Sequence, residues 1–134
     1  MSSLVNVLLV EDDEVDIMAM RRAFGKRKLE NPIHVAHDGL EALSLLYRVP
    51  RPYIILLDIN MPRMNGIEFL HALRKDANQK DAVVFVLTTS PAEQDRRAAY
   101  AANVAGYIEK SDVGKGFADL VDLLERYWSI VKLP

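Results

Sequence analysis

The sequence of 134 residues contains no cysteine. This absence excludes disulfide bonds, thiolate nucleophiles and zinc sites built on cysteine. Long apolar runs are also missing: none approaches the ~18 residues of a membrane-spanning helix, and the amino terminus lacks the basic and then apolar pattern of a secretory signal. We therefore expect a cytoplasmic protein with no membrane contact.

The sequence has no excess of charge of one sign. Its 17 Lys and Arg residues nearly balance its 19 Asp and Glu residues, which gives a net charge of −2. Nucleic-acid binding needs concentrated positive charge on one face, and the densest basic segment, residues 21–28, is typical of the solvated end of a helix. We expect no nucleic-acid partner.

Linkers, internal repeats and low-complexity segments are absent as well. With 50% hydrophobic and 27% charged residues, the composition is that of an ordinary globular domain, and the length is sufficient for one core. We expect a single domain over residues 1–134, in which residues 127–134 form a C-terminal tail, and no attached output domain.

The most informative stretch that is present covers residues 53–62. Its aliphatic run at residues 54–57 is too short for a helix and too apolar for an exposed strand, so it predicts a strand buried on both faces. The run ends at Asp58. Open α/β sheets bind ligands beyond the carboxyl ends of their strands, which makes Asp58 a candidate site residue.

Short aliphatic segments alternate with helical patterns along the chain. Strands are expected at residues 4–10, 33–36, 53–58, 82–87 and 104–108. Helices are expected after the N-capping residues Asp13, Asp38, Asn65 and Ser90, with Pro91 in the first turn of the fourth, and at about residues 114–130. The apolar positions of the second helix are Leu40, Leu43, Leu46 and Tyr47. This alternation predicts an α/β fold, a parallel five-stranded sheet with five helices on both faces.

Acidic residues follow two of these strands. All strands of a parallel sheet end at the same edge, so Glu11 and Asp12 after the first strand should approach Asp58 after the third. Two like charges about 4 Å apart repel by roughly 4 kcal/mol at an effective dielectric of about 20, so the cluster must protonate, spread into water or bind a cation. Oxygen ligands without nearby histidine or cysteine favour Mg²⁺. Helix capping alone would explain Asp13 but not Glu11 or Asp12.

The ends of the other strands carry a hydroxyl and an amine. Thr88 follows the fourth strand and Lys110 follows the fifth, and each alone would be an ordinary turn or surface residue. Together with the acids at the same edge, they describe a site for metal-assisted phosphoryl transfer to Asp58.

Four segments resemble the motifs of the receiver domains of two-component response regulators, in order and at that family's spacing. They are residues 8–13, residues 57–62 with Gly66, residues 87–89 and residues 106–110. The resemblance implies a flavodoxin-like fold with strand order 2-1-3-4-5. It also implies a signalling switch and not an enzyme, with chemistry limited to Mg²⁺-dependent self-phosphorylation and slow autodephosphorylation.

The same resemblance implies roles for the acids. Asp58 would accept a phosphoryl group from the phosphohistidine of a sensor histidine kinase. Asp12, Asp58 and the backbone carbonyl of Asn60 would bind Mg²⁺, with Mn²⁺ as an alternative ion, and Glu11 would act through water. Glu11 has one methylene more than the aspartate common in the family, which would alter this water-mediated contact.

The resemblance also assigns the remaining site residues. Thr88 and Lys110 would contact the phosphoryl group, and Tyr107 would move with Thr88 as a switch. Ser111 replaces the proline that commonly follows the lysine in the family, and a cis bond before Ser111 would cost roughly 3 kcal/mol.

A narrower resemblance links the chain to the single-domain regulators that pair with cyanobacterial phytochromes and bacteriophytochromes. It rests on residues 86–90, 110–111 and 124–134. It implies a bacteriophytochrome as the kinase and a homodimer formed by the fourth helix, fifth strand, last helix and tail. The last helix carries a second apolar stripe, which favours a partner surface unless the protein's own tail covers it. The expected contact residues are Tyr100, Leu123, Tyr127, Trp128, Ile130 and Leu133.

Three other functions are weighed against the receiver. A pseudo-receiver, which acts as an interaction module without phosphorylation, would be indicated by loss of Asp58, Thr88 or Lys110, and all three are present. A Mg²⁺-dependent phosphatase of the haloacid dehalogenase type needs a second acid two residues after its nucleophile, where this chain has Asn60. A flavodoxin needs a Ser/Thr-rich phosphate loop after the first strand, where this chain has four acids.

Overall fold

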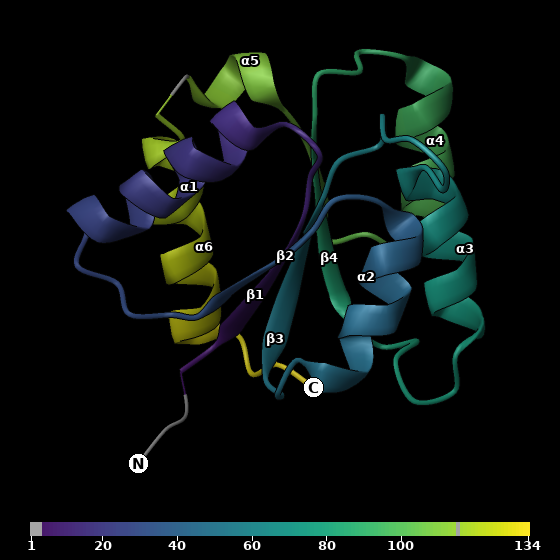
Figure 1. Cartoon of the computed structure of the whole chain (residues 1–134), viewed down its shortest axis with the longest axis horizontal. Coiled ribbons are helices and arrows are strands. Elements are labelled where there is room, and N and C mark those ends of the chain that lie inside the picture. Colours follow the sequence, from purple (N-terminus) through teal and green to yellow (C-terminus); the bar gives the residue numbers. More distant parts are fainter. Residues whose placement is uncertain (1–3, 115) are drawn as a thin grey trace.

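The computed structural model describes residues 4–114 and 116–134. Within them, parallel strands form one sheet in the order β2-β1-β3-β4-β5 (Figure 1). The strands are β1 (Asn6–Val10), β2 (Ile33–Ala36), β3 (Tyr53–Leu57), β4 (Val83–Thr88) and β5 (Gly106–Glu109). The predicted fold class and strand order are confirmed, although β1 and β5 each begin two residues later than expected.

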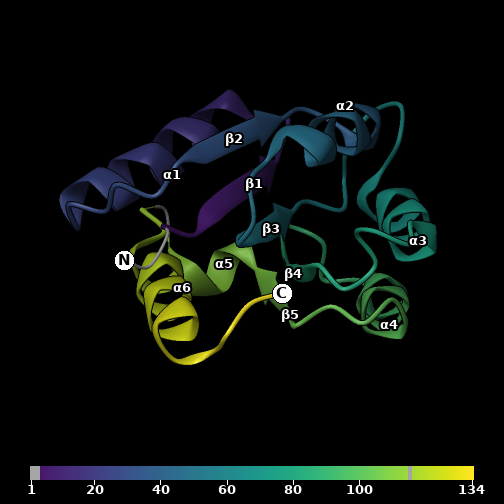
Figure 2. The same cartoon turned by 90° about the horizontal axis from the view of Figure 1, so that it is seen from below.

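Helices cover both faces of the sheet (Figure 2). On one face lie α1 (Glu14–Lys26) and α6 (Ala118–Ile130), and on the other lie α2 (Gly39–Leu45), α3 (Gly66–Lys75) and α4 (Glu93–Ala101). A 3₁₀ turn, η1 (Leu46–Arg48), extends α2, and a short helix, α5 (Lys110–Val113), follows β5. No helix in the described part of the chain is both long and apolar enough to cross a membrane.

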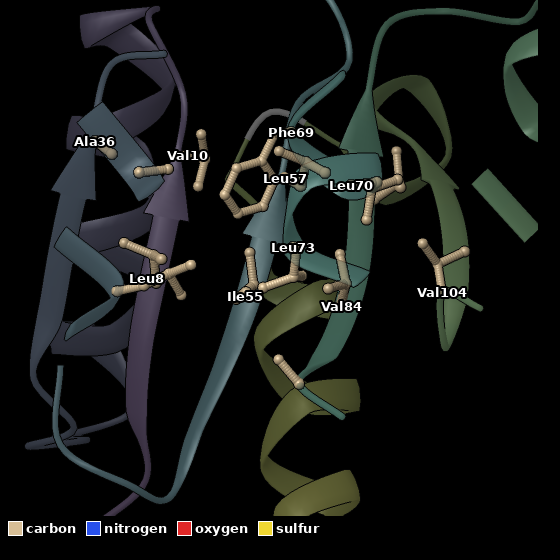
Figure 3. Packing of buried hydrophobic residues seen from close by; sticks show 14 of the residues in the cluster. Leu8, Val10, Ala36, Ile55, Leu57, Phe69, Leu70, Leu73, Val84 and Val104 are labelled. Atoms are coloured by element: carbon tan, nitrogen blue, oxygen red, sulfur yellow. The ribbon is translucent and has the colours of Figure 1, made fainter. Parts of the chain in front are cut away.

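The sheet separates two apolar cores, because successive side chains of a strand point to opposite faces. Ile55 and Leu57 of β3 pack toward α2, α3 and α4 (Figure 3). Ile54 and Leu56 pack toward α1 and α6. All four side chains are fully buried. The aliphatic run therefore marks a strand buried on both faces, as predicted.

Capping hydrogen bonds confirm three of the predicted helix starts. The side chain of Asp13 accepts from the backbone N–H two residues later, and that of Asp38 accepts from the N–H three residues later. Asn65 and Glu68 form a complete capping box, in which each side chain accepts the other's backbone N–H. Each cap contributes about 1 kcal/mol and sets where the helix begins relative to the strand before it.

The start of α4 differs from the prediction. The helix begins at Glu93 after Ala92, so Ser90 is not its N-cap and Pro91 is not its first residue. The Ser90 hydroxyl instead donates to Asp95 at 2.6 Å and accepts from the N–H of Ala92 at 3.3 Å. Ser90 is buried directly after β4, and this tertiary position overrides the local capping preference.

The helix α4 packs weakly on the sheet, because its sequence is rich in alanine and lacks large apolar residues on the buried side. Ala99 is its buried residue. Its carboxyl end is fixed by Arg74 of α3, whose guanidinium donates to the carbonyls of Ala102 at 2.7 Å and Asn103 at 3.1 Å. The same guanidinium donates to two carbonyls of the segment before β4. Arg74 thus joins the ends of α3 and α4.

The buried face of α2 is shifted from the expected one. Leu46 is buried as predicted, but Leu40 and Tyr47 are exposed, and Ala42 faces the core instead. The helix tightens into η1 at Leu46, and a 3₁₀ turn has a shorter period than an α-helix. The apolar stripe therefore does not continue along one line.

The last helix begins later than expected. The chain forms α5 after β5, passes through Gly114 and Phe117 with φ values of 71° and 55°, and starts α6 at Ala118. Positive φ is easily adopted by glycine and ends a helix, so the pattern beginning at residue 114 is interrupted. The Lys110–Ser111 bond is trans, since the cis bond in the described residues precedes Pro52.

The capping box of α3 gives a stability prediction. We expect Asn65→Ala to lower the free energy of unfolding by about 1 kcal/mol, because the backbone N–H of Glu68 loses its acceptor. Asn65→Ser, which keeps an acceptor oxygen, is the matched control and should lie within a few tenths of a kcal/mol of the parent. Urea denaturation measures both, and equal losses in the two variants would contradict a capping role.

Candidate functional site

The predicted site residues meet at the carboxyl edge of the sheet, the upper edge in Figure 1. Glu11 and Asp12 directly follow β1, and Asp58 directly follows β3. Thr88 ends β4, and Lys110 follows β5 as the first residue of α5. Parallel strands bring these positions together, as the sequence predicts.

Asp58 is buried, and both of its carboxylate oxygens have partners. Oδ1 accepts from the Thr88 hydroxyl at 2.8 Å and from the backbone N–H of Asn60 at 3.1 Å. Oδ2 lies 3.5 Å from the Lys110 ammonium. These contacts fix the orientation of the carboxylate and place a hydroxyl and a positive charge beside it.

The Lys110 ammonium is held more closely by two other acids. It donates to Glu11 Oε1 at 2.7 Å and to Asp16 Oδ2 at 2.6 Å. Burial lowers the pKa of Lys110, but hydrogen bonds to Asp16 and Glu11 outweigh it, so that the pKa lies above its usual value. Lys110 is therefore a permanent positive charge among three carboxylates.

Glu11 is the carboxylate most affected by burial. Burial raises the pKa of Glu11 from 4.5 to about 7, although the hydrogen bond from Lys110 opposes the shift. Its second oxygen, Oε2, accepts from the backbone N–H of Asp13 at 3.1 Å. Glu11 therefore gains or loses its proton near neutral pH.

The acids form an arrangement that suits a divalent cation. One oxygen from each of Glu11, Asp12 and Asp58 lies within 4.8 Å of the others. Asp12 is exposed, so the cluster opens to solvent. A cavity of about 460 Å³ lies beside it, lined by Asp12 and by residues of the β3–α3 loop that include Asn60. Carboxylate and carbonyl oxygens are ligands for hard divalent cations.

Close packing holds the β3–α3 loop in place. The N–H of Gly66 donates to the carbonyl of Ile59 at 3.0 Å. A side chain at Gly66 would place its Cβ 2.8 Å from the Ile59 Cα and closer still to the Asp58 carbonyl, so only glycine fits. The Arg63 guanidinium pairs with Asp38, which ties the loop to the start of α2.

A chain of hydrogen bonds leads from Asp58 to Tyr107. Thr88 Oγ1 accepts from the backbone N–H of Ser90 at 3.2 Å, and the Ser90 carbonyl accepts from the Tyr107 hydroxyl at 2.9 Å. The Tyr107 N–H in turn donates to the Tyr100 hydroxyl at 3.2 Å. Burial raises the pKa of Tyr107, which keeps its hydroxyl a donor.

Two residues of the site were not predicted. Ser90 was expected to cap α4, and no role in the site was predicted for Asp16. The sequence signal for Asp16 is its place on the first helical turn after β1, which a parallel sheet brings to the carboxyl edge. No comparable local pattern marks Ser90, because its role follows from where β4 ends.

The expected dimer residues fall into two groups. Tyr100, Leu123 and Ile130 are exposed, by 50%, 44% and 81%. The other three residues pack against the protein's own core: Tyr127 lies edge-on to Phe85, Trp128 lies beside Phe24, and Leu133 contacts the core between the sheet and α6.

Comparison with known proteins identifies the family. The family model of the response regulator receiver domain matches residues 7–121. The chain belongs to this family. Response regulator Rcp1 of Synechocystis sp. is 33% identical over 135 residues, which cover 96% of this chain and 92% of Rcp1.

Solved structures agree with this assignment. The Mn²⁺-bound form of Rcp1 matches with a TM-score of 0.84 at 33% identity, over 97% of this receiver and 99% of that chain. The phosphorylated cyanobacterial phytochrome response regulator RcpA gives 0.86 at 30% identity, over 98% and 99%. The bacteriophytochrome response regulator AtBRR gives 0.74 at 28% identity, over 99% of both chains.

These similarities confirm the resemblance to receivers and to the phytochrome-linked subgroup. The protein is a response regulator of phosphorylation-linked two-component signalling. Receivers of this family are signalling proteins rather than classical enzymes, and histidine kinases are their class of partner.

The raised pKa of Glu11 gives a pH prediction. An acid whose pKa is higher in the folded than in the unfolded state contributes stability at low pH, and this contribution is lost as pH rises through the folded pKa, here about 7. In the absence of divalent cations, we expect the free energy of unfolding to fall by about 1–3 kcal/mol between about pH 5 and about pH 8.

Glu11→Gln should flatten this dependence, because an amide does not titrate. Denaturant unfolding in the presence of a chelator, at several pH values, measures the effect. Asp112→Asn, which alters an exposed acid of α5, is the control and should keep the slope of the parent. An unchanged slope in Glu11→Gln would show that Glu11 is not the group responsible.

Proposed function

We propose that Asp58 is the phosphoacceptor of this receiver and that the donor is the phosphohistidine of a sensor histidine kinase. The observation that carries the proposal is the environment of Asp58. Its buried carboxylate is oriented by Thr88 and by the Asn60 N–H, and it faces the ammonium of Lys110. Glu11 and Asp12 lie beside it.

The proposed transfer is a displacement at phosphorus. A carboxylate oxygen of Asp58 forms a bond to phosphorus as the phosphorus–nitrogen bond of the phosphohistidine breaks, and the electron pair returns to the imidazole, which then takes up a proton. The Lys110 ammonium and the Thr88 hydroxyl would hold the phosphoryl oxygens by hydrogen bonds to these charged acceptors.

A divalent cation fits the acid cluster, and we propose Mg²⁺, with Mn²⁺ as an alternative. Asp12, Asp58 and the Asn60 carbonyl would hold it, and Glu11 would act through water. The cation supplies positive charge that offsets the charge of the incoming phosphoryl group. The donor set supports this assignment, and the relative Rcp1 has a Mn²⁺-bound form.

We further propose that Thr88, Ser90 and Tyr107 form the switch. When the Thr88 hydroxyl donates to a phosphoryl oxygen in place of Asp58 Oδ1, the Ser90 N–H that bonds to it must adjust. The Ser90 carbonyl then alters its bond to the Tyr107 hydroxyl. Coupling of this kind is typically worth about 1–3 kcal/mol.

The cognate kinase is proposed to be a phytochrome-type histidine kinase, since the relatives RcpA and AtBRR are phytochrome response regulators. The signal would leave through a homodimer or another protein contact on the α4–β5–α6 side, or by onward transfer of the phosphoryl group. The exposed apolar residues Leu123 and Ile130 of α6 support such a contact. We propose that residues 1–134 act as a single receiver with its C-terminal tail.

Intact mass after incubation with acetyl phosphate tests the acceptor. We expect one phosphoryl adduct that requires a divalent cation and is absent in Asp58→Asn. Asp112→Asn, which changes an exposed acid of α5, is the control and should label like the parent. A folded parent that does not label, while a known receiver does, would contradict the proposal and favour a pseudo-receiver.

The oligomeric state tests the dimer. We expect Leu123→Glu with Ile130→Glu to shift a dimeric parent to the monomer at equal concentration, because the exposed apolar surface becomes charged. Leu40→Glu, which charges an equally exposed leucine on α2, should leave the dimer intact. Analytical ultracentrifugation measures all three. A monomeric parent with and without acetyl phosphate, or a double variant that still dimerises, would contradict the proposal.

A further inference from the structure

The Lys110 ammonium is closer to Asp16 than to the carboxylate it is proposed to serve. The Nζ atom lies 2.6 Å from Asp16 Oδ2 and 3.5 Å from Asp58 Oδ2. Both partners are shielded from water, since the side chains of Lys110 and Asp16 are 12% and 25% exposed. A charge-assisted bond that is largely shielded from solvent is stronger than one on an open surface.

Asp16 differs from the other carboxylates at this edge. Glu11, Asp12 and Asp58 gather their oxygens into the candidate cation site, and Asp16 lies outside that group. A bound cation would therefore not interact directly with Asp16. It would interact with Glu11, the other close partner of Lys110. The Asp16–Lys110 pair is the contact that a phosphoryl group on Asp58 must compete with.

The surroundings allow this pair to open. Asp16 and Lys110 line a cavity of about 550 Å³ together with Val15, Ala19 and Phe117. Both side chains therefore border open space. The ammonium has three N–H donors, and the one directed at Asp58 makes the longest contact.

We infer that Asp16 is a positioning residue that holds the Lys110 ammonium back from Asp58 in the unphosphorylated protein. The inference rests on the proposed phosphorylation of Asp58. A phosphoryl group on Asp58 attracts the ammonium, but breaking or stretching the pair with Asp16 costs free energy. The charge of Asp16 also repels the phosphoryl group directly. Asp16 thus destabilises the phosphorylated state relative to the unphosphorylated state.

Beryllium fluoride, a tetrahedral mimic of a phosphoryl group, tests this inference in the presence of Mg²⁺. We expect Asp16→Asn, which removes the charge but keeps the shape, to bind beryllium fluoride about fivefold or more tightly than the parent. Asp16→Glu restores the charge and should return to the affinity of the parent. Isothermal titration calorimetry measures the dissociation constants, and circular dichroism checks that each variant is folded.

Glu14→Gln is the matched control. It removes the same charge from the same turn of α1, but Glu14 is exposed and pairs with His37 instead of Lys110. We expect its affinity to stay within about twofold of the parent, the scale of an exposed pair. Equal gains in Glu14→Gln and Asp16→Asn would assign the effect to the general field of the acidic edge and overturn the role of Asp16.

The remaining outcomes separate this inference from the proposed function. If the parent binds beryllium fluoride and Asp16→Asn binds it equally or more weakly, Asp16 does not hold Lys110 back, and the proposed function stands. If the folded parent shows no binding, the proposed function fails, and the inference with it. If Asp16→Asn does not fold, Asp16→Ser carries the same expectation. A crystal structure of the folded variant should show the Lys110 ammonium within direct hydrogen-bond distance of Asp58.

Discussion

The contact of the largely shielded Lys110 ammonium with the surrounding acids is the interaction on which the carboxyl edge of the sheet depends. Three carboxylates, from Glu11, Asp16 and Asp58, surround it. Without a positive charge, each close pair of acids would repel by roughly 4 kcal/mol, which is a large part of the stability of a domain. One ammonium cannot neutralise the charges of these three acids and of Asp12 together. The edge keeps a surplus of negative charge, and a divalent cation can balance it.

Much of this edge is predictable from the sequence, because its residues lie at the ends of strands. Asp58, Thr88 and Lys110 each lie at the end of a strand or directly after it, and a parallel sheet brings these ends together whatever the loops between them do. The capping signals at Asp13 and Asn65 are equally local, since the cap and its partner lie within one helical turn. Topology and capping therefore follow from short-range patterns.

The missed features depend on contacts between distant segments. Ser90 has the pattern of an N-cap, but burial at the end of β4 commits its hydroxyl to Asp95 and its carbonyl to Tyr107. Asp16 becomes part of the site because α5 brings Lys110 to it, across 94 residues of sequence. The apolar stripes of α6 likewise do not reveal that Tyr127 packs on Phe85, whereas Leu123 stays exposed. The pattern along one segment of sequence does not show which distant residue that segment contacts.

The two ends of α4 are held by different means. Arg74 anchors the carboxyl end through two carbonyls, whereas the amino end is joined to the β4–α4 loop by the Ser90–Asp95 hydrogen bond. Between the two ends, Ala99 is the buried residue of the helix. Its side chain is small, so it does little to oppose movement of α4 along the sheet. The carboxyl end of α4 is therefore tied to α3, and its amino end is tied to Ser90, a residue of the proposed switch. If phosphorylation moves Ser90, the amino end of α4 would follow through the bond to Asp95, while Arg74 would keep the carboxyl end in place.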